Sequence, residues 1–180
     1  LVLLNQDTVV SPSFLETLIR ALTDRTIGIV GCKAFYPDGT IQHAGGVVNI
    51  RGEGMHYGRG EVDVGQFDQS RDVDYVTGVG MALTRATLEM LGFLDEVFFP
   101  AYYEDVDWCY RVREAGLRVV YESHAVLIHR EASLGDFPTH EGMYAFHCNR
   151  LRFVLKHWPV ERLASEFLSA EQTWLKNLDM

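Results

Sequence analysis

The sequence has little basic charge, few cysteines and no long apolar run. Its 16 Lys and Arg residues are outnumbered by 25 Asp and Glu, which gives a net charge of −9. That balance disfavours nucleic acid as a partner, because binding phosphates requires a basic surface. The three cysteines (Cys32, Cys109 and Cys148) are far apart and lack metal-ligand spacing, so we expect free thiols in a reducing cytosol. No apolar run approaches the roughly 18–20 residues that span a bilayer, so no transmembrane segment is predicted.

What the sequence does contain is the composition of one globular domain. Its 180 residues are 47% hydrophobic and 12% aromatic, which is enough to bury a sizeable core. No charged-then-apolar signal peptide begins the chain. Because the chain starts inside an apolar run and without methionine, we expect it to be the rear part of a longer protein.

The pattern of apolar residues predicts an α/β fold. Strands are expected at residues 1–4, 27–31, 73–84, 117–121 and 125–128, and helices at about 14–22, 85–91, 104–115 and from 139 onward. Gly92 and Gly116 end two of these helices, and Trp158-Pro159 breaks the last one. Residues 51–72 are rich in glycine and charge, so we expect a long, mobile excursion there.

An acidic side chain follows the first predicted strand. Asn5, Gln6 and Asp7 come directly after Leu4, and ligands of open α/β sheets bind beyond the carboxyl ends of strands. Asp7 is therefore a candidate ligand for a divalent cation, because a hard oxygen ligand suits Mg²⁺ or Mn²⁺. The alternative is an ordinary turn in which Asp or Asn caps backbone amides.

Three carboxylates open the helix predicted at residues 104–115. Glu104, Asp105 and Asp107 would be favoured there by the helix dipole alone. At 3.6 residues per turn, Asp105 and Asp107 project to roughly opposite sides, so we expect one carboxylate in a cleft and the others capping the helix or paired with its arginines. We assign Asp105 to the cleft, with Trp108 on the same face as a bulky apolar wall.

His129 follows the strand predicted at residues 125–128. One imidazole together with Asp7 and diphosphate oxygens would make a mixed N/O site that accepts Mn²⁺ or Mg²⁺. A histidine at a strand end that is satisfied by backbone groups is the commoner arrangement, and it stays open.

Arg150 lies on the predicted C-terminal helix with other basic residues. This group would either neutralise a phosphate leaving group or meet a membrane surface. The alternative is a solvated basic face packed on the domain.

Taken in order along the chain, these segments resemble the family 2 glycosyltransferases of the GT-A fold, especially the bacterial rhamnosyltransferase-like members. Residues 3–8 look like the metal-binding D-x-D region, and residues 103–111 look like the ED-x-D block. Four further segments also resemble the family: 38–46, 77–85, 126–129 and 149–151. The resemblance runs from the first residue to about Pro159.

The resemblance implies a GT-A-like mixed sheet flanked by helices. It also implies inverting, metal-dependent transfer of a sugar from a UDP- or dTDP-sugar to a hydroxyl of a glycan or lipid-linked glycan. Bacterial polysaccharide or cell-surface glycan synthesis is the expected setting, in the cytoplasm or at the inner face of the membrane. By position in the motifs, the metal ligands would be Asp7 and His129, the catalytic residues Asp105 with Glu104, and the donor- and acceptor-binding residues Asn5, Gly78, Trp108 and Arg150.

This sequence departs from the family pattern in two ways. Asn5 replaces the first Asp of D-x-D, which leaves fewer charges for the metal. We expect this sequence to lack the N-terminal nucleotide-binding half, with residues 1–158 the C-terminal part of the domain and 159–180 a helical extension. We also expect this chain to be inactive alone and to expose an apolar sheet edge at residues 1–4 that favours a homodimer.

Two other classes of function remain as alternatives. A metal-dependent phosphohydrolase would also use acidic strand ends, although more clustered Asp and His ligands would be expected. A non-catalytic glycan-binding or interaction module is the second alternative.

Overall fold

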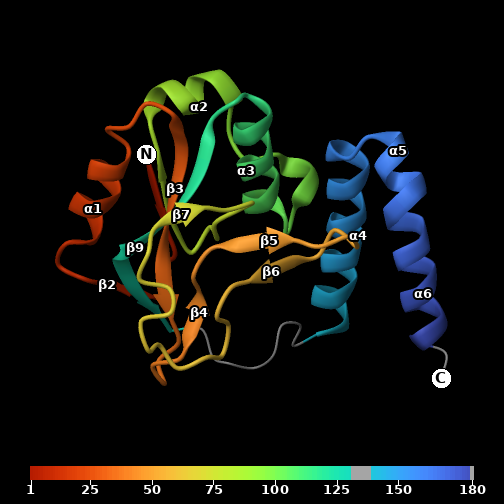
Figure 1. The fold of residues 1–180 in the computed structure, drawn as a ribbon, viewed down its shortest axis with the longest axis horizontal. Helices are drawn as coiled ribbons and strands as arrows, with labels where there is room; N and C mark the ends of the chain where they lie inside the picture. The colour runs from red at the N-terminus through yellow and green to blue at the C-terminus, as the bar shows by residue number, and fades with distance from the viewer. Residues whose placement is uncertain (131–138, 179–180) are drawn as a thin grey trace.

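The computed structural model describes residues 1–130 and 139–178 and has a mixed β-sheet at its centre. Within these residues the sheet has seven strands in the order β1-β8-β3-β9-β2, with β4 paired to β3 and β7 paired to β9 (Figure 1). β3 and β9 run parallel, whereas the other pairs are antiparallel. The strands are β1 Val2–Leu4, β2 Thr8–Val10, β3 Ile27–Phe35, β4 Ile41–His43, β7 Arg71–Asp72, β8 Gly80–Leu83 and β9 Arg118–His129. β5 (Gly46–Val48) and β6 (Gly54–His56) form a separate hairpin.

Helices cover both faces of this sheet. α1 (Phe14–Ala21) packs on one face, where Phe14 and Leu18 join a core that includes Val30. α3 (Glu104–Glu114) packs on the other face, in a core that includes Ile29. Because neighbouring residues of a strand point to opposite faces, β3 supplies apolar side chains to both cores.

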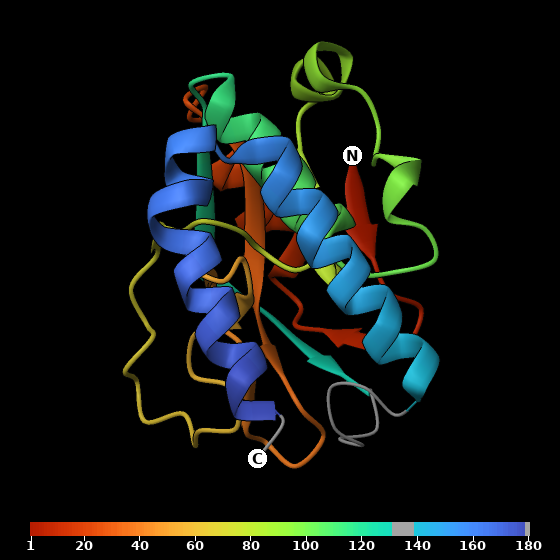
Figure 2. The same ribbon diagram turned by 90° about the vertical axis from the view of Figure 1, so that its right-hand side faces the viewer.

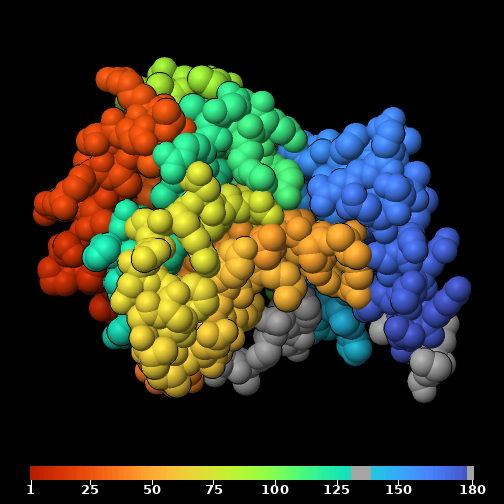
Figure 3. Space-filling model, in the orientation of Figure 1, coloured from red at the N-terminus to blue at the C-terminus, as the bar shows by residue number. Residues whose placement is uncertain are grey.

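The C-terminal helices lie on the side of α3 that faces away from the sheet. α4 (His140–His157) contacts α3 through the rings of Tyr110 and Phe153, whose centroids are 4.6 Å apart. α6 (Leu168–Leu178) runs beside α4 (Figure 2), and the β5–β6 hairpin, orange in Figure 3, reaches from the sheet to these two helices. The remaining helical elements are α2 Arg85–Leu91, η1 Glu96–Phe98, α5 Val160–Arg162 and η2 Leu163–Phe167. No helix in the described part of the chain is both long and apolar enough to cross a membrane.

Several boundaries agree with the sequence prediction. α2 covers residues 85–91 and is followed by Gly92 in a positive-φ conformation. α3 begins at Glu104 and gives way to Ala115 and Gly116, and α4 ends where Trp158-Pro159 was expected to break the tail. These ends depend on local signals, which explains why the sequence located them.

Four strand predictions were wrong in extent. The strand expected at 27–31 continues to Phe35, and the one expected at 73–84 is confined to Gly80–Leu83. The strands expected at 117–121 and 125–128 are one strand, β9. Its polar interruption is an irregularity in the pairing with β3, where Ser123 bonds to the hydroxyl of Ser70 and the carbonyl of Asp68. Tertiary partners therefore satisfy polar groups that looked like a strand end.

The first strand, β1, lies at the edge of the sheet. Among the described residues it pairs only with β8, and Leu1 and Leu4 are 54% and 46% exposed. The expected exposed apolar edge at residues 1–4 is thus present in the described structure.

The excursion at residues 51–72 is attached to the sheet by a buried cation. Lys33 of β3 is 3% exposed, and its ammonium lies 2.9 Å from Asp63 and 2.7 Å from Asp68. The hydroxyl of Tyr121 donates to the Phe67 carbonyl at 2.9 Å. The sequence did not predict this contact, because Lys33 stands alone among apolar residues of its strand and nothing nearby identifies its acidic partners.

Asp107 links α3 to the end of α4. Its fully buried carboxylate lies 2.8 Å from Arg111, 2.6 Å from Lys156 and 2.8 Å from His157. Burial opposes ionisation, but the hydrogen bonds from His157, Lys156 and Arg111 outweigh it and lower the pKa of Asp107. The predicted pairing of one acidic residue with Arg111 is confirmed.

Asp107→Asn should destabilise the fold by about 3 kcal/mol, because it removes the buried counter-charge of Arg111, Lys156 and His157. The pKa of Asp107 is lower in the folded chain than in the unfolded one. Its stabilisation is therefore complete above the unfolded value of about 4 and disappears as the pH falls through the folded value. Urea unfolding at pH 7 and at acid pH should show the difference between the two proteins shrinking with acid.

Glu16→Gln is the matched control, because Glu16 forms an i,i+4 pair with Arg20 in which both side chains are more than 70% exposed. It should change stability by less than about 0.5 kcal/mol. An Asp107→Asn protein as stable as this control would show that the buried cluster contributes nothing.

Candidate active site

Asp7 and His129 lie close together at one end of the sheet, where β1 ends and β9 ends. The segment Asn5–Asp7 joins β1 to β2, and the antiparallel register of β2 with β9 sets Thr8 opposite His129. The Asp7 Oδ1 atom lies 3.1 Å from His129 Nε2. The predicted proximity of these two residues, 122 positions apart in the chain, is confirmed.

Three side chains contact the ring nitrogens of His129. Gln42 Oε1 lies 3.1 Å from Nδ1 and accepts its proton, while the Asn5 side-chain amide lies 3.4 Å and the Asp7 carboxylate 3.1 Å from Nε2. Nε2 donates to Asp7 when it carries a proton, and its lone pair is available to a cation when it does not.

The Asp7–His129 pair fits a divalent cation. Two ligands that bind one ion at adjacent positions, each about 2.0–2.2 Å away, are themselves about 3 Å apart. A histidine ligand commonly donates its other ring N–H to a fixed acceptor, the part that Gln42 takes here. In the described residues no group of three or more His, Cys, Asp or Glu could hold a metal, so this pair would need further ligands from water or substrate.

The second half of the site is formed by Asp105, in the first turn of α3. Its Oδ2 accepts from the Gly78 amide at 2.9 Å, and its Oδ1 accepts from the Val106 amide at 2.8 Å. Burial raises the pKa of Asp105, and these two hydrogen bonds, with one from Thr77, partly offset that rise. Asp105 is thus a carboxylate held in place that binds protons more readily than an exposed aspartate.

Glu104 is the neighbouring carboxyl and has a different environment. Its Oε2 is buried, with no hydrogen-bond partner among the described residues. Burial, followed by the negative charge of Asp105, raises the pKa of Glu104. The two carboxyl groups therefore differ in how well the protein stabilises their ionised forms, and the ionised form of Asp105 is the better stabilised.

One short backbone segment connects the two halves. The backbone amide of Gly78 donates to Asp105, and the carbonyl of the next residue, Val79, accepts from the backbone amide of Asn5 at 3.0 Å. Asn5 is in turn beside His129. The segment 77–79 thus brings together Asn5, Gly78 and Asp105, which the sequence placed in three separate motifs.

The turn before α3 is held in an unusual backbone conformation. Tyr102 and Tyr103 have φ values of 75° and 73°, the left-handed region that residues with side chains rarely adopt. Asn149 of α4 is 1% exposed, and its amide nitrogen donates to the carbonyls of Phe98, Ala101 and Tyr102 at 2.7–3.0 Å. Such strain persists only where the surroundings impose it, so Asn149 sets the position of Glu104 and Asp105.

Two predicted binding residues are not in this site. Trp108, predicted as an apolar wall beside the base, is 1% exposed and donates from Nε1 to the Gly92 carbonyl at 3.1 Å, so it packs in the core. Arg150 is also 1% exposed, and it lies 2.9 Å from Glu171 of α6. It therefore forms neither a solvated basic face nor an available phosphate-binding group. Packing between α4 and α6, which the sequence did not reveal, buries it.

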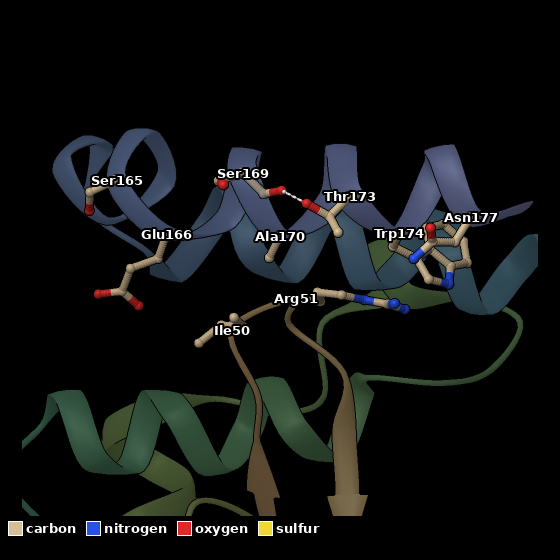
Figure 4. Close-up of a pocket in the computed structure, with 9 residues that line it drawn as sticks. All are labelled: Ile50, Arg51, Ser165, Glu166, Ser169, Ala170, Thr173, Trp174 and Asn177. Carbon is tan, nitrogen blue, oxygen red and sulfur yellow. Dashed lines mark hydrogen bonds between the residues drawn. The ribbon is translucent and has the colours of Figure 1, made fainter.

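The described residues also form an open groove of about 570 Å³, between α6 and the turn at Ile50 and Arg51 (Figure 4). Arg51 stacks on Trp174 there, with 4.4 Å between the guanidinium carbon and the ring centroid. None of the predicted site residues lines this groove.

Sequence reasoning missed three residues that organise the site: Gln42, His43 and Asn149. Each is buried and acts on a partner far away in the chain. The available signal was their presence in segments that resemble the family, at residues 38–46 and 149–151, but no local pattern gave their roles.

Comparison with known proteins points to one family. The family model described as "Glycosyltransferase like family 2" matches residues 1–151. The "O-antigen biosynthesis protein RfbC" of Myxococcus xanthus is 36% identical over 140 residues, which are 74% of this chain and 11% of that protein. The "Uncharacterized protein y4gI" of Sinorhizobium fredii is 31% identical over 170 residues, 90% of this chain and 18% of that protein. The chain thus spans less than a fifth of the length of these curated relatives.

A solved structure shares the fold. "Crystal structure of GalNAc-T7 with UDP, GalNAc and Mn2+" superposes with a TM-score of 0.57 at 14% identity, over 85% of this chain and 30% of that chain. The expected GT-A architecture of a mixed sheet flanked by helices is confirmed by this match. The predicted boundary between residues 158 and 159 is not tested by it, although Phe167, beyond that boundary, belongs to the same core as α3.

Asn149→Leu should loosen the turn that precedes α3, because it keeps the side-chain volume and leaves three carbonyls without their donor. We expect a loss of about 1–3 kcal/mol in stability. Hydrogen exchange should also become faster in residues 98–107. Leu155→Asn, at a 70% exposed position of the same helix, is the control and should alter neither quantity. Unchanged exchange in Asn149→Leu would contradict the positioning role.

Proposed function

Because this chain belongs to the glycosyltransferase-like family 2, we propose that the protein containing it transfers a sugar from a nucleotide-diphosphate donor to an acceptor hydroxyl, with inversion. The observation that carries the proposal is the backbone segment 77–79. It contacts Asp105 through Gly78 and Asn5 through Val79. These contacts support a site in which the proposed proton acceptor lies on one side of the segment and Asn5, which contacts His129, lies on the other.

Asp105 is the proposed base. Its Oδ atoms accept from backbone amides, and its raised pKa favours proton uptake compared with an ordinary aspartate. Asp105 takes the proton of the acceptor hydroxyl as that oxygen forms its bond to the anomeric carbon. The bond from that carbon to the diphosphate breaks with its electron pair leaving on the phosphate oxygen. A single displacement of this kind inverts the anomeric centre.

Glu104 has the supporting role. No described residue donates to its buried Oε2 to stabilise an anion, and the charge of Asp105 disfavours a second negative charge. We expect Glu104 to be protonated when Asp105 is ionised and to donate a hydrogen bond in the site.

Asp7 and His129 are the proposed cation ligands, with Gln42 fixing the histidine ring. A bound Mn²⁺ or Mg²⁺ supplies positive charge against the departing diphosphate. The residues fit this use through their 3.1 Å separation and through Gln42, which accepts from Nδ1 and leaves Nε2 to face the cation.

The relatives support the choice of substrates. GalNAc-T7 was solved with UDP, GalNAc and Mn²⁺, and RfbC is named for O-antigen biosynthesis. We extend both to this chain and propose a UDP- or dTDP-sugar donor and a glycan or lipid-linked glycan acceptor in bacterial polysaccharide synthesis. The free thiols of Cys32, Cys109 and Cys148 agree with a cytoplasmic location, which we propose at the inner face of the membrane.

The open edge of β1 supports a further part of the proposal. Its unpaired backbone groups and its exposed leucines favour the addition of another strand. We propose that a second copy or another segment of the protein covers it.

Asp105→Asn in the full-length protein should lower turnover by about 10²–10⁴-fold and leave donor affinity unchanged, because it keeps the shape and removes the basicity. In the wild type, the acid limb of the pH–rate profile should lie above pH 4, since the pKa of Asp105 is raised. Steady-state kinetics with UDP- and dTDP-sugars measure both.

Glu104→Gln is the discriminating control, and it should cost less turnover than Asp105→Asn. If Asp105→Asn kept near wild-type turnover while Glu104→Gln lost it, Glu104 would be the base. If neither variant affected turnover, or the wild type transferred no sugar, a binding module would become the better description.

Mn²⁺ binding in the presence of UDP should depend on Asp7 and His129, and electron paramagnetic resonance titration measures it without turnover. Asp7→Asn and His129→Ala should remove most of the affinity, and Gln42→Leu should reduce it about 10–100-fold. His124→Ala is the matched control, because His124 lies 3.2 Å from Glu122 on the same strand but is 77% exposed. Equal affinity in all four variants would exclude the proposed metal site.

A further inference from the structure

A pair of histidines, one fully buried and one half-buried, lies next to the proposed site and takes no part in the mechanism above. His43 of β4 is fully buried, and its Nδ1 lies 2.7 Å from Nδ1 of His56 at the end of β6. The ring of Tyr75, 2% exposed, packs against both, with centroid distances of 5.8 and 5.7 Å. The three rings fill the space between the hairpin and the segment that leads to Gly78.

The contacts assign the protons of this pair. The Thr77 amide donates to His43 Nε2 at 3.4 Å, so Nε2 carries no proton. The proton of neutral His43 is then on Nδ1 and points to His56 Nδ1, which accepts it. A second proton on His43 would place an N–H against the Thr77 amide and remove that hydrogen bond.

The surroundings keep both rings neutral. Burial, then the charges of His56 and Arg59, lower the pKa of His43 well below its usual range. Burial and Arg59 lower the pKa of His56 to about 4. Near neutral pH the two rings are therefore an uncharged hydrogen-bonded pair, in which Nε2 of His43 accepts from the Thr77 amide.

Thr77 is the link to the chemistry. It is 9% exposed, its hydroxyl bonds to Asp105, and its neighbour Gly78 donates its amide to the same carboxylate. Loss of the acceptor at His43 would leave the Thr77 amide buried without that partner, which favours movement of the segment. Asp105 depends on the same segment for two of its contacts.

We propose that the His43–His56 pair is a positioning element for catalysis: it holds the segment 77–79 and, through that segment, the carboxylate of Asp105. This inference rests on the proposed function, in which Asp105 is the base. Neither histidine touches the reacting atoms. The adjacent strand residue Gln42 orients His129, so β4 supports both halves of the site from opposite faces.

The test compares three variants of the full-length protein. His43→Phe keeps a ring and removes the acceptor. His43→Gln returns an acceptor near the position of Nε2. Tyr121→Phe, the matched control, removes another buried hydrogen bond to backbone, the one to Phe67. The readouts are kcat and KM for the donor, Mn²⁺ affinity, and hydrogen exchange of peptides covering residues 76–80.

His43→Phe should lower kcat by about 10–100-fold, because small misplacements of a catalytic group have effects of this size, with KM and Mn²⁺ affinity unchanged. Exchange at residues 76–80 should become faster. His43→Gln should restore most of the turnover and the protection. Tyr121→Phe should lose stability but keep kcat.

Two results would overturn the inference. One is a His43→Phe protein that keeps both its kcat and its protection at residues 76–80. The other is a kcat loss in Tyr121→Phe as large as in His43→Phe, which would indicate a general packing role. Failure of the proposed function is recognised separately, because Asp105→Asn would then retain turnover whatever the histidine variants do.

Discussion

The parallel pairing of β3 with β9 is the interaction on which the other parts of this structure depend. It joins residues 27–35 to residues 118–128, and β3 is buried on both of its faces. β4 is held against β3 and brings Gln42 and His43, whereas β2 is held against β9 and brings Asp7 to His129. Displacement of β3 along β9 would separate Gln42 from His129, because that contact is set by the register of the two strands.

The acidic start of α3 shows how environment decides the use of a carboxylate. Asp105 and Asp107 are two residues apart and leave the helix on different sides. Asp107 faces Arg111, Lys156 and His157, which lower its pKa, and it joins two helices. Asp105 faces neutral amides, and burial raises its pKa. The same residue type therefore gives a structural anion at one position and a candidate base at the other.

Much of the local structure and part of the site could be predicted. The ends of α2, α3 and α4 follow glycine and proline signals, and the divergence of Asp105 from Asp107 follows from helical periodicity. The proximity of Asp7 and His129 came from the family resemblance. Trp108 and Arg150 could not be assigned correctly, because their burial depends on Gly92 and Glu171 in other elements.

By itself, the sequence determined the α/β class, the helix ends and the identity of the carboxylates, since these depend on neighbouring residues and on composition. Only the tertiary structure decided that Gln42 orients His129, 87 residues away, and that His43 holds Thr77, 34 residues away. It also decided that Asn149 fixes the turn before α3. Hydrogen bonds between buried groups require both partners to be placed by the fold, and no local pattern in the chain records such a pairing.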